Sequence, residues 1–247
     1  EALGASQTQL YCANNIKYDM RVDPSQKDQG QQKRQLWGAS RPCLIAASTH
    51  PGEEAKVLEA FTQVQRQIKD ACLLLAPRHP VRTDELIELC ETFNFQSVRA
   101  SQCLDQAVQH PDIVMVDTLG ELCLFYAAAD VAFIGGSLIE HGGHNPIEPA
   151  QLACACVSGE HVFNFEEVYA RLYAEGGCVC IKDADTLAEA WLKILQDEAF
   201  RTSLMARAHS VVQSAQGGVL RHIKLIETLL ASGYSGSSKL SKPVLTL

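Results

Sequence analysis

The chain has 247 residues, of which 47% are hydrophobic and 20% charged, so it is long and apolar enough to bury a sizeable core. Its 29 acidic residues outnumber its 21 basic ones, and the formal net charge of −8 excludes a basic surface that coats nucleic acid. No apolar run approaches the roughly 20 residues that cross a bilayer. The sequence begins at Glu1 without a methionine or a secretion signal, so we expect a soluble, globular piece of a longer protein.

Short apolar runs then alternate along the chain with amphipathic stretches. The runs at 43–48 and 71–76 are apolar throughout, as in strands that are buried on both faces, and residues 53–69 between them have apolar positions at helical spacing. Further strands are predicted at 96–99, 113–116, 131–134, 155–158 and 178–181. Further helices are predicted at 83–93, 120–128, 146–152, 165–175, 186–196, 198–213 and 219–230. This alternation predicts an α/β fold with a doubly wound, Rossmann-like parallel sheet.

The two ends of the chain lack this pattern. Residues 23–41 are rich in glutamine and charge and have no apolar stripe, so we expect a linker or crossover there. Residues 1–22 are then the end of a preceding amino-terminal domain, and 42–232 the Rossmann-like domain. Residues 233–247 form a tail that is Ser-rich at its start. The alternative is that the first forty residues are an irregular extension of the same domain.

Ten cysteines are spread over the chain, most of them in apolar runs. There is no C-x-x-C pair, and the two C-x-C pairs place both thiols on one face of a strand, where a tetrahedral ion is awkward to complete. The long core and the missing signal argue against a disulfide framework. We therefore expect buried, reduced thiols and a reducing, cytosolic compartment.

Ligands of an open parallel sheet bind beyond the carboxyl ends of its strands, so the loops after the strands carry the functional signal. After the first strand, Ser48 and Thr49 can cap the next helix or offer backbone N–H groups to an anion. After the second strand, Arg78 follows Pro77 on a loop that Pro80 also stiffens, and its guanidinium suits a phosphate or carboxylate.

Two further loops carry glycine. In the first, Thr118 and Glu121 have the spacing of a capping box, and Gly120 could leave its N–H open to a ligand. In the second, 135–149, two glycine pairs let the backbone approach a ligand closely. There we expect Asn145 to cap a helix whose dipole keeps Glu148 ionised, able to accept two hydrogen bonds from a ribose diol.

Other known site types are disfavoured. His141 and His144 have the spacing of a metal pair on a helix, but the two glycines between them preclude a stable helix, so we expect no metal. No Gly-Lys-Ser/Thr, G-x-G-x-x-G or G-x-S-x-G motif occurs, which removes the usual markers of P-loop, NAD and hydrolase sites. We expect no cofactor.

Taken together, these loops resemble 3-deoxy-D-manno-octulosonic acid (Kdo) transferases, inverting glycosyltransferases of the two-domain GT-B type. The similar stretches, in matching order, are 46–54 (AASTHPGEE), 76–80 (APRHP), 117–130 (DTLGELCLFYAAAD), 135–150 (GGSLIEHGGHNPIEPA) and 161–165 (HVFNF). The resemblance is to the carboxy-terminal half of these enzymes, and 42–232 would then be its nucleotide-sugar-binding domain. Residues 15–19 more weakly resemble the end of the family's first domain.

The resemblance implies a donor site for CMP-Kdo. By the family's pattern, the nucleotide-binding residues are Pro77, Arg78, Leu119, Gly120, Glu121, Asn145, Pro146, Ile147 and Glu148, and further candidates are Lys17, Ser48, Thr49 and Gly136. Leu119 stands where the family usually has methionine. Asn14 stands before Asn15 where a glycine is usual, which weakens the transfer of a phosphate role to Lys17.

The resemblance also implies how the whole enzyme works. Arg78, Lys17 and backbone N–H groups would neutralise the single phosphate without a metal ion, and the general base would be a glutamate of the amino-terminal domain. The chain alone would then bind nucleotide and transfer no sugar. The full enzyme would act on lipid A precursor at the cytoplasmic side of the bacterial inner membrane, which it would contact through its amino-terminal half, and it would bind no nucleic acid.

Three alternatives remain at this point. The first is another GT-B enzyme that uses a UDP-sugar, and the second is a nucleotide-binding module without catalysis. The third, a Cys/His metal protein, is the weakest of the three.

Overall fold

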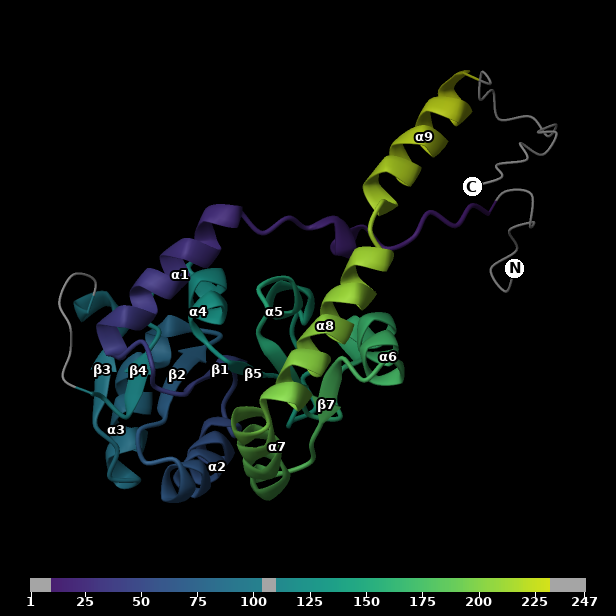
Figure 1. Cartoon of the computed structure of the whole chain (residues 1–247). Helices are drawn as coiled ribbons and strands as arrows, with labels where there is room; N and C mark the ends of the chain where they lie inside the picture. The colour runs from purple at the N-terminus through teal and green to yellow at the C-terminus, as the bar shows by residue number, and fades with distance from the viewer. Residues whose placement is uncertain (1–9, 104–109, 232–247) are drawn as a thin grey trace. The chain divides into compact units, whose positions relative to one another are not determined.

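The computed structural model describes residues 10–103 and 110–231 (Figure 1). The tail predicted at 233–247 lies outside these residues. The described chain divides into a larger unit within Val22–Val212 and a smaller unit taken from Glu1–Arg21 and Gln213–Leu247. No helix among the described residues is both long and apolar enough to cross a membrane.

A seven-stranded parallel sheet is the centre of the larger unit (Figure 1). Its strands are β1 (Cys43–Thr49), β2 (Cys72–Pro77), β3 (Ser97–Arg99), β4 (Ile113–Met115), β5 (Val131–Ile134), β6 (Ala155–Ser158) and β7 (Cys178–Cys180). Their order in the sheet is β3-β4-β2-β1-β5-β6-β7. From β1 the chain builds one half of the sheet with β2, β3 and β4, of which β4 lies between β2 and the edge strand β3. From β5 it builds the other half outward, which confirms the doubly wound fold. The switch point between β1 and β5 is where such sheets bind ligands.

Helices cover both faces of the sheet, and the side chains of β1 alternate between two hydrophobic cores. Leu44 and Ala46 belong to one core, and Ile45 and Ala47 to the other. The first core includes α2 (Glu54–Gln67), α3 (Thr83–Thr92) and α7 (Ala184–Gln196), and the second includes α4 (Leu122–Ala128). Figure 1 shows α1 and α4 on the face opposite α2, α3 and α7. Burial on both faces explains why the strands are apolar throughout rather than alternating.

The remaining helices of the larger unit are shorter or lie near its carboxyl end. They are α5 (Ile147–Gln151), α6 (Glu166–Ala174) and α8 (Glu198–Ser214), together with the 3-10 turns η3 (Pro80–Arg82), η4 (Ala100–Gln102) and η5 (Phe163–Phe165). Every strand and helix that the sequence predicts between residues 43 and 214 is present, with bounds that differ by a few residues at most.

The segment 23–41, expected to be a linker or crossover, contains helix α1 (Pro24–Trp37), which packs on α4. Its apolar contact is concentrated in its last residue, Trp37, which is buried and stacks on Phe125 of α4 with ring centroids 5.9 Å apart. The contacts of Gly30 and Gln31 are small and polar, so the helix shows no apolar stripe. A side chain at Gly30 would collide with Ala127, and Gln31 Nε2 donates to the Ala127 carbonyl at 2.9 Å. The larger unit therefore includes this segment, and the expected boundary at residue 42 differs from the observed one.

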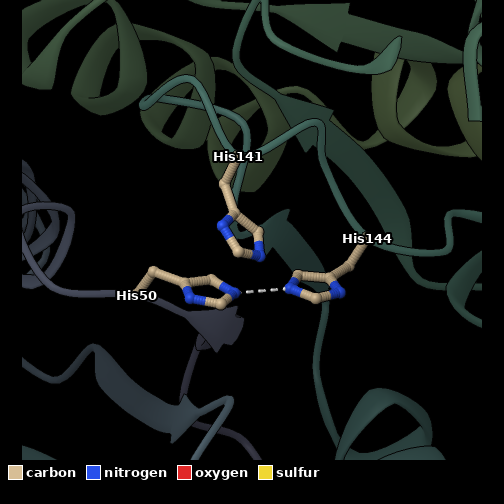
Figure 2. A group of neighbouring side chains, drawn as sticks. All are labelled: His50, His141 and His144. Atoms are coloured by element: carbon tan, nitrogen blue, oxygen red, sulfur yellow. Dashed lines mark hydrogen bonds between the residues drawn. The ribbon is translucent and has the colours of Figure 1, made fainter. Parts of the chain in front are cut away.

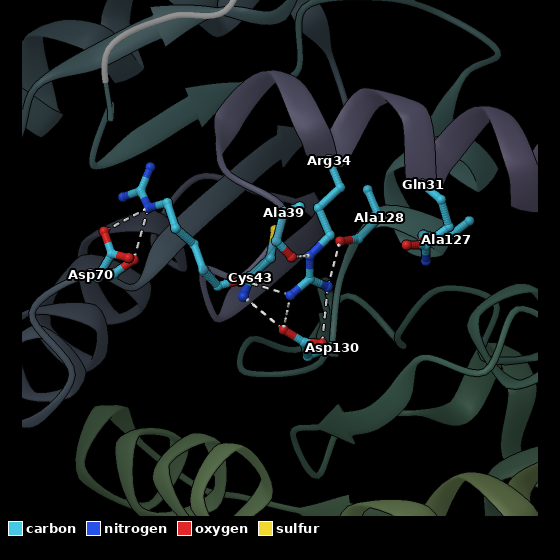
Figure 3. A network of polar contacts seen from close by, with 9 residues as sticks. Gln31, Arg34, Ala39, Cys43, Asp70, Ala127, Ala128 and Asp130 are labelled. Carbon is cyan, nitrogen blue, oxygen red and sulfur yellow. Dashed lines mark hydrogen bonds and ion pairs between the residues drawn. The ribbon is translucent and has the colours of Figure 1, made fainter.

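Arg34 of α1 is the main polar anchor of this helix (Figure 3). Its guanidinium binds both carboxylate oxygens of Asp130, at 2.9 and 2.8 Å, and donates to the carbonyls of Ala128 and Arg41. Asp130 also accepts a hydrogen bond from the N–H of Cys43 at the start of β1. One ion pair thus joins α1 to the starts of β1 and β5.

The smaller unit contains η2 (Ile16–Asp19) and α9 (Gly218–Ala231), which contact each other. The Asp19 carboxylate accepts hydrogen bonds from the N–H groups of Val219 and Gly217, and these lower the pKa of Asp19. Five apolar side chains of α9 are exposed: Val219, Leu220, Ile223, Ile226 and Leu230. Helix α9 was expected within the 42–232 domain, but it groups with the amino-terminal residues.

The cysteines are all free thiols, as predicted. Seven of the ten are buried, and only Cys12 and Cys180 are exposed. Burial raises the pKa of the Cys90 and Cys178 thiols to about 12, so these groups stay protonated and act as small apolar side chains.

Candidate functional site

A pocket of about 170 Å³ opens beyond the carboxyl ends of β1, β2 and β4. Its lining residues are Ser48, Ala76, Pro77, Arg78, Pro80, Val116, Thr118, Leu119, Gly120 and Leu122. Five of the predicted site residues, from three separate loops, therefore converge here: Ser48, Pro77, Arg78, Leu119 and Gly120. Small-molecule sites measure about 300–1,000 Å³, so this pocket encloses only part of a nucleotide-sized ligand.

Arg78 is the cation of this pocket. Its backbone is held by a 2.9 Å hydrogen bond from its N–H to the Thr49 carbonyl, which joins the loops after β1 and β2. The side chain is exposed, and no carboxylate within residues 10–103 or 110–231 pairs with its guanidinium. By contrast, Arg82 on the next turn is paired with both Glu54 and Glu85. Arg78 is thus positioned by its backbone and free to bind an anion.

The loop that leads into α4 does not form the predicted capping box. Helix α4 begins at Leu122, and Glu121 at its N-cap makes no capping bond with its side chain. Thr118 lies too far before this start to cap the helix, so that prediction is wrong. In the described structure, Thr118 Oγ1 and Glu121 Oε2 are buried without a hydrogen-bond partner. Beside them, the Leu119 side chain is 80% exposed, so an apolar contact is open to a ligand.

Glu148 lies on α5 and is not among the residues that line this pocket. Asn145 Nδ2 donates to Glu148 Oε1 at 3.3 Å, and Asn145 Oδ1 accepts from the N–H of Ile147, the first residue of α5. The N-cap of this helix is Pro146, so the prediction that Asn145 caps it is wrong by one residue. Glu148 also faces the thiol of Cys123, the neighbour of the pocket residue Leu122. Burial raises the pKa of Glu148, which is opposite in direction to the dipole effect that we expected.

Three other predicted site residues lie near Glu148 and the switch point, and each of them has a role in the fold. Ile147 is fully buried, and Pro146 is the N-cap of α5. The N–H of Gly136 donates to Glu53 Oε2 at 2.7 Å, so it is not open to a ligand.

Glu53 was not among the predicted site residues, yet it organises the switch point. Its side chain is completely buried. Oε2 accepts from the N–H groups of His50 and Gly136, at 3.1 and 2.7 Å, and Oε1 accepts from those of Ser137 and Leu138, at 3.0 and 2.9 Å. Burial raises its pKa and the four N–H bonds oppose this; since every partner is a donor, the ionised carboxylate fits the site. One side chain thus holds the loops after β1 and β5 together.

The loop after β1 also shows backbone strain. Ser48 has a φ of 55°, a left-handed conformation that is uncommon for residues other than glycine, and the β1–β2 register shifts there. The Thr49 side chain is buried, and its Oγ1 has no hydrogen-bond partner in the described structure. Such strain and unpaired polar atoms cluster at functional sites. Lys17 belongs to η2 in the smaller unit, and its phosphate role stays a prediction.

Three histidines meet beside these loops (Figure 2). His141 and His144 follow β5, and His50 follows β1; the nearest ligand atoms of the three lie within 4.8 Å of one another. The sequence singled out only the first two, because His50 is about ninety residues away and no spacing rule links it to them. Burial lowers the pKa of His50 and of His144 to about 4, helped in His144 by the nearby Arg78 charge.

Comparison with known proteins shows to which family the chain belongs. The chain is 33% identical over 229 residues to the 3-deoxy-D-manno-octulosonic acid transferase of Haemophilus influenzae, covering 92% of the chain and 53% of that protein. It is 31% identical to the Bordetella pertussis enzyme of the same name, covering 87% of the chain and 51% of that protein. The crystal structure of the C-terminal CMP-Kdo binding domain of WaaA from Acinetobacter baumannii matches with a TM-score of 0.72 and 34% identity, covering 77% of the chain and 100% of that domain.

The chain belongs to the Kdo transferase family. It spans about half the length of the curated Kdo transferases that it matches. The Anabaena protein HepE, solved with UDP and glucose, has a TM-score of 0.57 at 15% identity over 93% of the chain and 59% of that protein, and shows the shared fold alone. The fold is thus the predicted Rossmann-like half of a GT-B glycosyltransferase. No protein-family model matches the chain.

Proposed function

We propose that this chain is the donor-binding half of an inverting Kdo transferase and binds CMP-Kdo. The observation that carries this proposal is the convergence of Pro77, Arg78, Leu119 and Gly120 on one pocket at the carboxyl ends of the strands. These are positions that the family's pattern assigns to the nucleotide. The name of the Acinetobacter baumannii relative, a CMP-Kdo binding domain, supports the same ligand.

Arg78 binds the phosphate in this proposal. A CMP-sugar has one phosphate, and an unpaired, backbone-held guanidinium can stabilise the negative charge that grows on it as the sugar leaves. The unpaired Thr118 Oγ1 in the same pocket offers a further hydrogen bond to the donor. The phosphate therefore needs no metal ion.

Glu148 binds the ribose. Asn145 Nδ2 donates to one of its carboxylate oxygens at 3.3 Å, and Asn145 Oδ1 is in turn held by the N–H of Ile147. Carboxylate oxygens accept hydrogen bonds from the two hydroxyls of a ribose diol. The elevated pKa that burial imposes on Glu148 would fall when the diol donates to it.

Transfer itself needs a second domain. The family's general base is a glutamate of the amino-terminal domain, and the longer relatives have room for such a domain. The exposed apolar side chains of α9 are a surface on which it could pack. We propose that the chain alone binds nucleotide and transfers no sugar, and that Lys17 contributes to the phosphate site only in the whole enzyme.

The whole enzyme would transfer Kdo to lipid A precursor for lipopolysaccharide core synthesis, at the cytoplasmic side of the inner membrane. The net charge of −8 on this chain opposes contact with anionic lipid. We therefore assign the membrane contact to the amino-terminal half.

The test is calorimetric titration of the chain with CMP and with UMP. CMP should bind more tightly, and Arg78→Ala should weaken CMP binding by about 1.5–3 kcal/mol, the usual range for a charge-assisted hydrogen bond. Arg66→Ala, which removes an exposed arginine of α2 far from the loops, should leave the affinity unchanged. A preference for UMP, equal affinity of the Arg78→Ala variant, or turnover of CMP-Kdo by the chain alone would each contradict the proposal.

A further inference from the structure

The histidines at the switch point, His50, His141 and His144, present nitrogen atoms to a common centre (Figure 2). His50 Nε2 and His144 Nε2 are 2.8 Å apart and share one hydrogen bond in nearly coplanar rings. The ring of His141 lies over that of His50, with their centroids 3.8 Å apart. Two strands and two loops thus bring together three side chains whose preferred chemistry is metal ligation.

The backbone of each histidine is held in place by a side chain from elsewhere. Glu53 accepts the N–H of His50, Asn164 Nδ2 donates to the carbonyl of His141 at 2.9 Å, and Tyr169 Oη donates to the carbonyl of His144 at 3.0 Å. Glu53 directly precedes α2, and Asn164 and Tyr169 belong to η5 and α6, so the contacts come from three separate parts of the chain. Such outside contacts are how proteins orient metal ligands.

Imidazole binds a metal ion in its neutral form. Arg78 and His79 also face the cluster, and the Arg78 charge repels a cation. The Glu53 carboxylate, bonded to the N–H of His50, supplies an opposing negative charge.

We propose that His50, His141 and His144 form a binding site for a divalent transition metal ion, with Zn²⁺ as its best occupant. Zn–N bonds of about 2.0–2.1 Å in a tetrahedron place ligand nitrogens about 3.3 Å apart. The closest pair must therefore separate by about 0.5 Å, and His141 must leave its stack on His50. His141 is exposed and precedes Gly142 and Gly143, both at positive φ, so its side chain has room to move.

Three protein ligands leave the fourth tetrahedral position to water. From the sequence, a metal site at His141 and His144 was disfavoured because the glycines between them preclude a helix. In the structure the third ligand, His50, comes from a distant loop, so no helix is needed. The site uses other side chains than the proposed phosphate site, although Arg78 faces both.

The experiment is titration with Zn²⁺ and with Co²⁺. Both are carried out on the chain with Cys12→Ser and Cys180→Ser, which removes the two exposed thiols that could compete for the metal. We expect one equivalent of Zn²⁺ to bind, and the Co²⁺ complex to show the visible bands of tetrahedral coordination without a thiolate charge-transfer band. His141→Ala should weaken Zn²⁺ binding at least about tenfold, since even second-shell changes cost 10–100-fold.

His209→Ala is the matched control, because His209 is exposed on α8 and outside the cluster. It should bind Zn²⁺ like the parent chain. Circular dichroism should show that His141→Ala remains folded, as expected for an exposed loop residue. The inference is overturned if the parent binds no stoichiometric Zn²⁺, if His141→Ala binds it equally well, or if the Co²⁺ complex shows thiolate coordination.

Discussion

Replacing Glu53 by glutamine tests whether one buried carboxylate holds the switch point together. Each oxygen of Glu53 accepts two backbone N–H groups, at distances of 2.7–3.1 Å. Glutamine has nearly the same shape, but its NH₂ group must replace one oxygen and then face two N–H donors. Each buried donor left without an acceptor costs about 1–3 kcal/mol. We therefore expect Glu53→Gln to lower the free energy of unfolding by about 2–6 kcal/mol.

The assay is urea unfolding followed by tryptophan fluorescence. Both tryptophans of the chain, Trp37 and Trp191, are buried in the larger unit, so the signal reports the unit that contains Glu53. Glu59→Gln is the control, because Glu59 is exposed on the same helix and should change the stability by no more than about 0.5 kcal/mol. A Glu53→Gln variant as stable as this control would refute the assignment.

Two further predictions concern charge in the larger unit. Asp130→Asn leaves the Arg34 guanidinium buried without a counter-charge, so it should lower the free energy of unfolding by about 3 kcal/mol in the same assay. A change below about 0.5 kcal/mol would show that water can replace this ion pair. Because the pKa values of His50 and His144 fall from 6.5 to about 4 on folding, the unfolded chain binds more protons between these values, and stability should decrease as the pH falls through this window. A His50→Gln/His144→Gln variant should lose less stability over the same window, and an unchanged pH profile would contradict the cause that we give.

Much of the site could be predicted because it consists of consecutive residues that follow strands. Pro77 and Arg78 come directly after the apolar run of β2, and the parallel order of the strands brings them to one edge of the sheet with Leu119 and Gly120. The position of these loops follows from the fold class alone. That no carboxylate among the described residues pairs with Arg78 was known only from the structure.

The predictions that failed concern where individual polar groups find their partners. Thr118 and Glu121 have capping-box spacing, but the helix starts at Leu122, so the spacing is not used. Gly136 could have offered its N–H to a ligand, but the Glu53 carboxylate accepts that N–H from the start of α2. A pattern in the sequence states which bonds a residue can form, and competition in the folded chain decides which bonds it does form.

By itself, the sequence determined the α/β fold, the strands of the sheet and the loops that line the pocket, because burial on both faces and the amphipathic period of helices leave strong local signals. Only the tertiary structure decided that α1 packs through Gly30 and Arg34, that Glu53 binds two loops at once, and that His50 joins His141 and His144. These contacts join residues 80 to 100 positions apart through polar groups. Polar contacts between distant residues have no periodicity, so only the folded chain reveals them.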